Sequence, residues 1–310
     1  LYVERRELQN GADAAALAVA QDCAEGDCGS GGGTVRAQQY ADLNADDGVS
    51  ALDPSTPCGD GPGLPACSEG APSGATGASG WVRVGTSTKD PDGGSEVSFL
   101  LAPIIGALTG KTVTASAVAA WGPMGAGAAV PLVFSLCEWT AMGGDLDAGT
   151  FPSDSKAITF HGTNPSSVDC PIGPSGLDLP GGFGRVIAAN CKAHLTVGEW
   201  ADVDPGANLA ADCDVQSWQD NEVVIAIFDE TNGETGANGA YHIAGFVGFE
   251  VAGYRIVASR GGGGVQKYGS CTPDSPSDQY LCGKFTWVST DGGEFGTGPD
   301  FGARVIKMVG

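Results

Sequence analysis

Ten cysteines are the residues of this chain whose chemistry is most readily recognised, and they are spread along its whole length. Their number is even, none stands at C-x-x-C spacing, and none of the three histidines lies beside a cysteine at zinc-finger spacing. The pattern favours disulfides over metal thiolates, and therefore an oxidising compartment outside the cytosol. The candidates for disulfide bonds are Cys23, Cys28, Cys58, Cys67, Cys137, Cys170, Cys191, Cys213, Cys271 and Cys282.

Sequence alone does not fix which of these cysteines pair. A short loop closes at a smaller entropic cost than a long one, which favours pairing between neighbours. This argument predicts the pairs 23–28, 58–67, 191–213 and 271–282, with 137–170 left over.

The segment DLNADDGVSALD, residues 42–53, is the best candidate for a metal site. Asp42, Asn44 and Asp46 occupy positions 1, 3 and 5 of an EF-type calcium loop, and Asp53 occupies position 12. The loop departs from the pattern because position 6 is aspartate, and position 12 has the shorter acid. Calcium is therefore a candidate ligand here and in the oxygen-rich segment 229–239, and Asx-turns are the alternative for both.

Catalytic motifs do not stand out. The chain has no G-x-S-x-G nucleophile elbow and no G-x-x-x-x-G-K-[ST] phosphate loop. Two carboxylates stand beside tryptophans, Glu138–Trp139 and Glu199–Trp200, but without a sugar-binding cleft such pairs do not define a glycosidase. We expect no catalytic residue, no cofactor-binding residue and no enzymatic activity.

The charge of the chain limits its partners. There are 37 Asp and Glu against 15 Lys and Arg among 310 residues, giving a net charge of −22. Such a field repels phosphate backbones, so we expect no nucleic acid partner. The apolar fraction of 42% is enough for a sizeable core. No run of 18 apolar residues occurs that could span a membrane.

The first secondary-structure element that the sequence predicts is a helix over residues 1–23. Its apolar residues recur at the spacing of one helical face, and most are alanines, which allow close approach to a neighbour. Gly11 costs this helix about 1 kcal/mol relative to alanine. The residues expected to form the packing face are Leu8, Ala12, Ala15, Ala16 and Val19.

The rest of the chain predicts short elements and many turns. A second helix is expected from Thr34, as N-cap, to about Leu43. Its buried side is expected to carry Val35, Gln38 or Gln39, and Tyr40. Strands are expected at 81–88 and 111–122, and a short apolar helix at 99–110. The later strands are PLVFSLCEW, KAITFHG, GRVIAANC, EVVIAIFDE, YHIAGFVGFEVAGYRIVASR, KFTWVST and ARVIKMV.

These elements predict an α+β protein with an N-terminal alanine-rich helix packed on an antiparallel sheet, followed by a larger β-rich, disulfide-stapled region. The first domain is expected over residues 1–128 and the second over residues 129–310.

The opening segment, LYVERRELQNGADAAALAVAQDC, resembles the N-terminal module of TadE/TadG-like proteins of the Flp (tight adherence, type IVb) pilus machinery. AQQYADLN at 37–44 is similar to the second helix of that family, and PLVFSLCEW to TadG-related proteins of high-GC Gram-positive bacteria. The residues that carry the resemblance in the opening segment are Leu1, Tyr2, Arg5, Arg6, Leu8, Gln9, Asn10, Ala12, Asp13, Ala14, Ala15, Ala16, Leu17, Ala18 and Ala20.

The resemblance implies a non-enzymatic cell-surface protein of the Tad/Flp pilus system, either a minor pilin or a pilus-associated structural or adhesion protein. It also implies an extracellular head, contacts with other pilus or envelope subunits through the N-terminal helix, and a membrane anchor in a segment upstream of Leu1. Two alternatives stay open: a secreted calcium-dependent binding module, and an exported hydrolase.

Overall fold

The chain folds as an α+β protein, as the sequence predicts. The computed structural model describes residues 2–28, 33–89, 94, 97–98, 110–146, 149–152, 154–161, 184–204, 209, 213–234, 236–256, 271 and 279–310. They divide into two compact units, Leu1–Gly122 with Ile306–Gly310, and Pro123–Val305. The sequence predicts a domain boundary between residues 128 and 129. The two units of the structure divide between Gly122 and Pro123, inside strand β6 (Thr114–Ala129).

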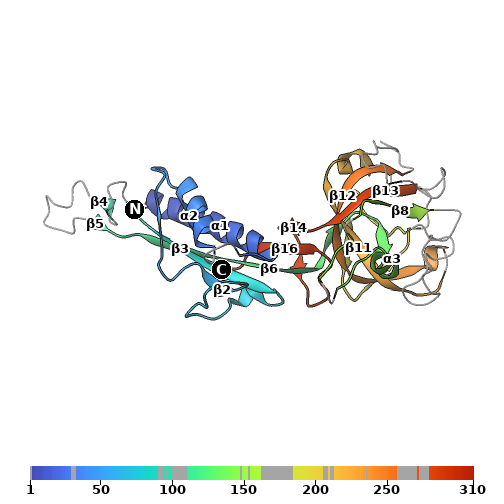
Figure 1. The fold of residues 1–310 in the computed structure, drawn as a ribbon, viewed down its shortest axis with the longest axis horizontal. Coiled ribbons are helices and arrows are strands. Elements are labelled where there is room, and N and C mark those ends of the chain that lie inside the picture. Colours follow the sequence, from blue (N-terminus) through green and yellow to red (C-terminus); the bar gives the residue numbers. More distant parts are fainter. Residues whose placement is uncertain are drawn as a thin grey trace. The chain divides into compact units, whose positions relative to one another are not determined.

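Two helices form the helical layer of the first unit (Figure 1). Helix α1 spans Tyr2–Ala24 and α2 spans Thr34–Leu43, which confirms both predicted helices. The start of α2 differs in detail, because Gly33, with a φ of 77°, is the N-cap and Thr34 is the first helical residue. Glycine suits this left-handed position since it has no Cβ to clash.

The buried side of α2 differs in part from the prediction, because Tyr40 packs against the apolar cluster of the first unit but Val35 does not. Val35 is 73% exposed, whereas Ala37 and Ala41 are buried. The pair Ala37 and Ala41 is spaced by four residues and so shares one face of the helix. Close helix packing thus selects the small residues over the larger valine.

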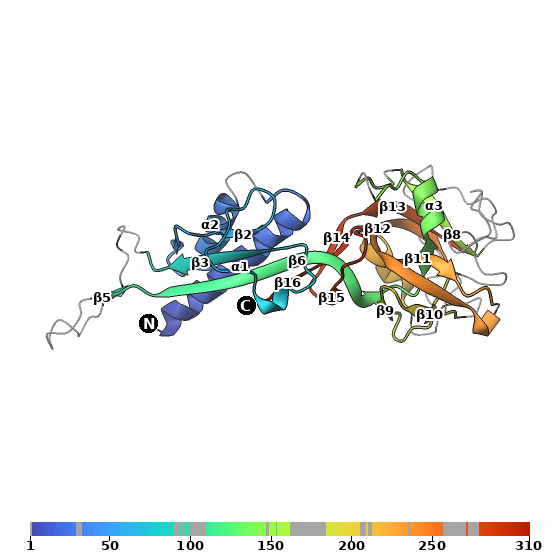
Figure 2. The same cartoon turned by 90° about the horizontal axis from the view of Figure 1, so that it is seen from below.

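An antiparallel sheet forms the other layer of the first unit, with β3 and β6 alongside α1 (Figure 2). Strand β3 (Gly80–Ser87) pairs with the first part of β6, from Gly80↔Trp121 to Ser87↔Thr114. Two short strands, β1 (Ala51–Leu52) and β2 (Cys58–Asp60), pair with the other edge of β3. A 3-10 turn lies at Ser73–Ala75, and Val309 N donates to Val118 O at 2.9 Å.

A separate two-stranded sheet, β4 (Val97–Ser98) with β5 (Gly110–Lys111), completes the first unit. The apolar helix predicted for 99–110 lies outside the described residues except for its last position, which belongs to β5.

The second unit is built on a sheet of order β7-β11-β12-β13-β8, with β10 paired to β12. The pair β7–β11 is parallel, and the others along this path are antiparallel. The strands are β7 (Val133–Ser135), β8 (Lys156–His161), β10 (Trp200–Asp202), β11 (Glu222–Thr231), β12 (Ala240–Arg255) and β13 (Gln279–Thr286).

Shorter strands surround the second half of β6 in the same unit. β9 (Ala193–Thr196) and β15 (Glu294–Phe295) pair with β6, and β14 (Val288–Thr290) pairs in parallel with the first part of β16 (Ala303–Met308). From Ile306 onward β16 belongs to the first unit. Short helical turns lie at α3 (Leu136–Ala141), Val215–Trp218 and Gly236–Asn238.

The long strand β12 is covered on both faces. Val247, Phe249 and Val251 belong to one apolar cluster, and Tyr241 and Ile243 belong to another. A strand covered on both faces is apolar at nearly every position, which explains the uninterrupted apolar run in the sequence.

Two predicted strands of this region are corrected by the structure. PLVFSLCEW is a strand only at Val133–Ser135 and then becomes α3, whose N-cap Ser135 accepts a hydrogen bond from Cys137 N. The sequence feature that indicates this helix is the capping-box spacing of Ser135 and Glu138. GRVIAANC contributes only isolated bridges, and Asn190 and Cys191 form its turn with positive φ values of 52° and 60°.

Candidate functional site

The alanine face of α1 is buried inside the first unit. Its neighbours are Val82 and Val84 of β3 and alanines of β6, all in one apolar cluster. Small side chains bring the helix and the sheet close together, which strengthens dispersion contacts. The exposed fractions of the predicted residues are 5% for Leu8 and 0% for Ala12, Ala15, Ala16 and Val19.

Gly11 lies where α1 meets α2. A Cβ atom at this position would lie 3.3 Å from the carbonyl oxygen of Ala41 and 3.5 Å from its Cα. The glycine therefore permits a close crossing of the two helices. Packing between the two helices offsets the helix stability that is lost because position 11 is glycine and not alanine.

Two side chains tie α1 to the sheet by hydrogen bonds. Thr86 Oγ1 on β3 donates to the carbonyl oxygen of Leu8 at 2.9 Å, and this contact is buried. Gln9 Nε2 donates to Ser116 O on β6 at 3.1 Å and to Asp13 Oδ1 at 2.8 Å. The helix is thus held in register on the strands and is not merely pressed against them.

The opposite side of α1 is exposed. Tyr2, Val3 and Leu17 are 80%, 66% and 37% exposed, and Arg6 is exposed as well. Arg5 is also exposed, but it lines the cleft beside β3 and β6. The first two turns therefore present apolar and basic groups together.

Carboxylates gather near the N-terminal end of α1. A depression of about 330 Å³ is lined by Glu4 and Glu7 of the helix and by Asp46 and Asp47 of the loop after α2. Burial raises the pKa of Glu4, and the nearby charges of Glu7 and Asp47 raise it further. Like charges at this short range disfavour the ionised form.

Asp42, the first predicted calcium ligand, accepts hydrogen bonds from the protein itself. Its Oδ1 accepts from Ser50 N at 2.8 Å, Ser50 Oγ at 2.9 Å and Gln38 Nε2 at 2.8 Å. Ser50 is only 2% exposed, so this carboxylate satisfies polar groups that water does not reach.

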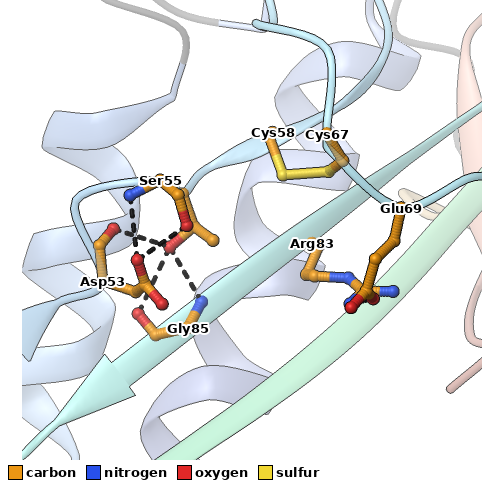
Figure 3. Close-up of a disulfide and its surroundings, with 8 residues drawn as sticks. Asp53, Ser55, Cys58, Cys67, Glu69, Arg83 and Gly85 are labelled. Carbon is orange, nitrogen blue, oxygen red and sulfur yellow. Dashed lines mark hydrogen bonds and ion pairs between the residues drawn. A yellow bond between two sulfur atoms is a disulfide. The ribbon is translucent and has the colours of Figure 1, made fainter.

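The other predicted ligands have separate local contacts. Asn44 Nδ2 donates to Tyr40 O at 2.8 Å, and Asp46 is exposed. Asp53 Oδ1 accepts from Ser55 N at 2.9 Å, which is an Asx-turn, and from Ser55 Oγ at 2.7 Å (Figure 3). The hydrogen bonds from Ser55 lower the pKa of Asp53.

The four predicted ligands do not come together. Across the part of the chain that the structure describes, no three His, Cys, Asp or Glu side chains are grouped so that they could hold a metal ion. The second candidate, 229–239, likewise contains an Asx-type contact, because Asn232 Oδ1 accepts from Glu234 N at 3.2 Å. Calcium binding at these two segments stays a prediction. The structure shows Asx-type contacts in both of them.

Four of the predicted cysteine pairs are bonded: 23–28, 58–67, 191–213 and 271–282. Cys137 also takes part in a disulfide, and its expected partner, Cys170, lies outside the described residues. None of the described cysteines is free. The neighbour-pairing argument therefore succeeds wherever the structure tests it.

The 58–67 disulfide stands beside a polar cavity of about 1100 Å³ in the first unit. Figure 3 shows the bond joining β2 to the loop that follows it, with Arg83 of β3 directed at Glu69. Because these two charges pair with each other, they stabilise the loop on the sheet.

The second unit brings together residues that the sequence did not single out as a set. His242 Nδ1 lies 2.6 Å from Asp229 Oδ1, and the His242 ring lies 5.4 Å from the ring of Trp200, centroid to centroid. The hydrogen bond to Asp229 raises the pKa of His242. Bulges in the β11–β12 pairing place Asp229 beside His242, and irregular register of this kind has no signal in the sequence.

The two carboxylate–tryptophan pairs differ in the structure. Trp139 is 1% exposed and belongs to the core, whereas Trp200 is 48% exposed. Glu199 and Trp200 line one shallow depression of the second unit.

The comparisons with known proteins support the family resemblance of the opening segment. The family model of Flp pilus-assembly TadE/G-like proteins matches residues 1–22, which lie within or directly before α1. No curated protein and no solved structure matches the chain. None of the helices in the described segments is both long and apolar enough to cross a membrane.

A disulfide-bearing α+β protein with a TadE/G-like opening helix is the class that the fold and this match define. The match connects the chain to Flp pilus assembly and indicates an envelope or surface location.

Proposed function

We propose that this protein is a non-enzymatic cell-surface component of the Tad/Flp pilus system, of the TadG-related actinobacterial type. It acts as a minor pilin or as a pilus-associated structural or adhesion protein. The observation that carries the proposal is the TadE/G-like match over residues 1–22, together with the burial of that segment's alanine face on the β3–β6 sheet.

The architecture supports a structural role. Disulfides form and persist in the oxidising environment outside the cytosol, where they limit opening of the chain. The described cysteines are bonded, and Asp42 and Asp53 accept local hydrogen bonds, which are structural roles. The net charge of −22 supports a partner other than nucleic acid.

The partners of this protein are other pilus or envelope subunits, which contact the exposed side of α1. The alanine face is already covered within the first unit, so an outside partner uses the side that carries Tyr2, Val3 and Leu17. Apolar side chains with Arg6 among them suit a mixed apolar and acidic surface.

The proposal is tested by deleting the gene and counting Flp pili by electron microscopy, with complementation by variants. We expect the deletion to reduce pilus number, pilus length or pilus-dependent attachment. The variant Val3→Asp should complement poorly, whereas Leu43→Asp should complement fully, since Leu43 is 72% exposed but lies on α2. Unchanged pili and attachment in the deletion strain would contradict the proposal.

A further inference from the structure

We propose that the second unit binds an uncharged sugar ring in the depression beside Trp200. This inference goes beyond the proposed function, because it rests on the second unit alone and holds whether or not the chain belongs to a pilus. It starts from an exposed tryptophan, and large aromatic side chains left in a depression mark binding sites.

The backbone holds Trp200 out of the core. Strand β10 alternates exposed, buried, exposed, so that Ala201 enters the apolar cluster while Trp200 and Asp202 face outward. Trp200 pairs with His242 of β12, and Gly198 N donates to Ile243 O at 2.8 Å in the turn before it. The ring is therefore presented by paired strands and not by a free loop.

The neighbouring ring of His242 limits the movement of Trp200. The two ring centroids lie 5.4 Å apart, and Asp229 fixes His242 through the 2.6 Å contact at Nδ1. A ring that is already held in place loses less conformational entropy when a ligand binds.

The depression is lined by both apolar and hydrogen-bonding side chains. Ile187, which is 63% exposed, lies in it together with Trp200. Its polar groups come from His194, Thr196, Glu199 and Asp202. Its volume is about 230 Å³, which suits one ring and not an extended drug-sized molecule.

A sugar ring matches this combination. Its C–H groups carry partial positive charge and pack on the negative face of an indole ring. Its hydroxyl groups can donate to Glu199 and Asp202, whose carboxylates are acceptors only. The net charge of −22 repels acidic sugars and phosphorylated ligands, so an uncharged ring is favoured.

A basic side chain is the competing occupant, because ammonium and guanidinium groups also bind tryptophan faces and carboxylates. The carboxylates of Glu199 and Asp202 would attract such a cation, but Thr196, an uncharged donor and acceptor, also lines the depression and suits a hydroxyl group better than a cation. The experiment below distinguishes binding of a sugar ring from binding of a basic side chain.

The experiment uses the purified full chain on an array of neutral, acidic and amino glycans. NMR titrations follow, with the simple methyl glycoside of any glycan that binds and, separately, with a lysine-rich peptide. Wild type should bind at least one neutral glycan. Trp200→Ala should weaken that binding at least about tenfold, as expected for an aromatic anchor. Trp287→Ala is the control for loss of a tryptophan from the same unit, because Trp287 lies outside the depression and packs on Phe151 and Arg304. Glycan binding by the folded variant should stay within about twofold of wild type.

Asp202→Asn provides a second variant should Trp200→Ala fail to fold. It leaves the ring in place but changes an acceptor, and it should weaken binding by about threefold or more. The inference is overturned if no neutral glycan binds, if Trp200→Ala binds as wild type does, or if Trp200-dependent binding is found only for a lysine-rich peptide.

Discussion

Thr86 of β3 donates a buried hydrogen bond to the carbonyl oxygen of Leu8, and this 2.9 Å contact joins the sheet to the helix that carries the family match. Replacing Thr86 by valine keeps the shape but removes the donor. We expect the free energy of unfolding of the first unit to fall by about 0.5–1.5 kcal/mol. Thr86→Ser, which keeps the donor, should lose less in urea unfolding, and an equal loss in both variants would contradict a role for the hydrogen bond.

The alanine face should not tolerate larger side chains. Ala16 is fully buried between α1 and the sheet, so Ala16→Leu inserts atoms where there is no space. We expect a loss of about 1–3 kcal/mol. Gln21→Leu adds the same side chain at an exposed position of the same helix and should change stability by less than about 0.5 kcal/mol in parallel urea melts. If Ala16→Leu were as stable as wild type, the tight packing described here would be wrong.

Asp42 should stabilise the protein without calcium. Asp42→Ala removes the acceptor of Ser50 N and Ser50 Oγ, and we expect a loss of about 1–3 kcal/mol. The loss should be the same in EDTA and in excess calcium, because the three donors to Asp42 Oδ1 are protein groups.

The calcium hypothesis makes the opposite prediction for the same measurement. If Asp42 were a calcium ligand, EDTA would lower the melting temperature of wild type and abolish its advantage over Asp42→Ala. Glu25→Ala, at an exposed acidic position outside the candidate loop, is the control for nonspecific effects of charge.

The 58–67 disulfide should contribute measurably to the first unit. Its cysteines are 9 residues apart. Closing a loop of that size in the unfolded chain corresponds to about 2–3 kcal/mol. The double variant Cys58→Ser/Cys67→Ser should therefore unfold at lower urea concentration, whereas reductant should have no further effect at this pair. Equal stability of the double variant and wild type would contradict this assignment.

The His242–Asp229 pair should make stability depend on pH. The hydrogen bond to Asp229 raises the folded-state pKa of His242 above its ordinary 6.5. The stabilisation is thus fully present below pH 6.5 and is lost as pH rises through the folded-state pKa. Asp229→Asn should lower the NMR pKa of His242, and its stability deficit should be larger at about pH 6 than at about pH 9. An unchanged pKa in Asp229→Asn would contradict the pairing.

The sequence predicts the parts of this fold that depend on periodicity and on short loops. The alanine spacing identifies the buried face of α1, and neighbour pairing identifies the four disulfides that the structure describes. Both arguments use contacts within or between nearby residues, so the information they need is local.

The sequence does not predict features set by distant contacts. Val35 suits a buried helix position, but the close approach of α1 and α2 selects Ala37 and Ala41 instead. The strand prediction for PLVFSLCEW fails because apolar content outweighed the capping signal of Ser135. The meeting of Trp200, His242 and Asp229 depends on three separate strands and on bulges that leave no pattern.

The most direct test of the proposed role is to locate the protein in the cells that produce it, with antibodies against the chain applied to sheared pili, envelope and culture medium. The account predicts that the protein is found in the pilus or envelope fraction and that deletion of the major Flp pilin changes its distribution. A protein found only inside the cell, or one whose distribution is the same with and without the pilin, would contradict the account.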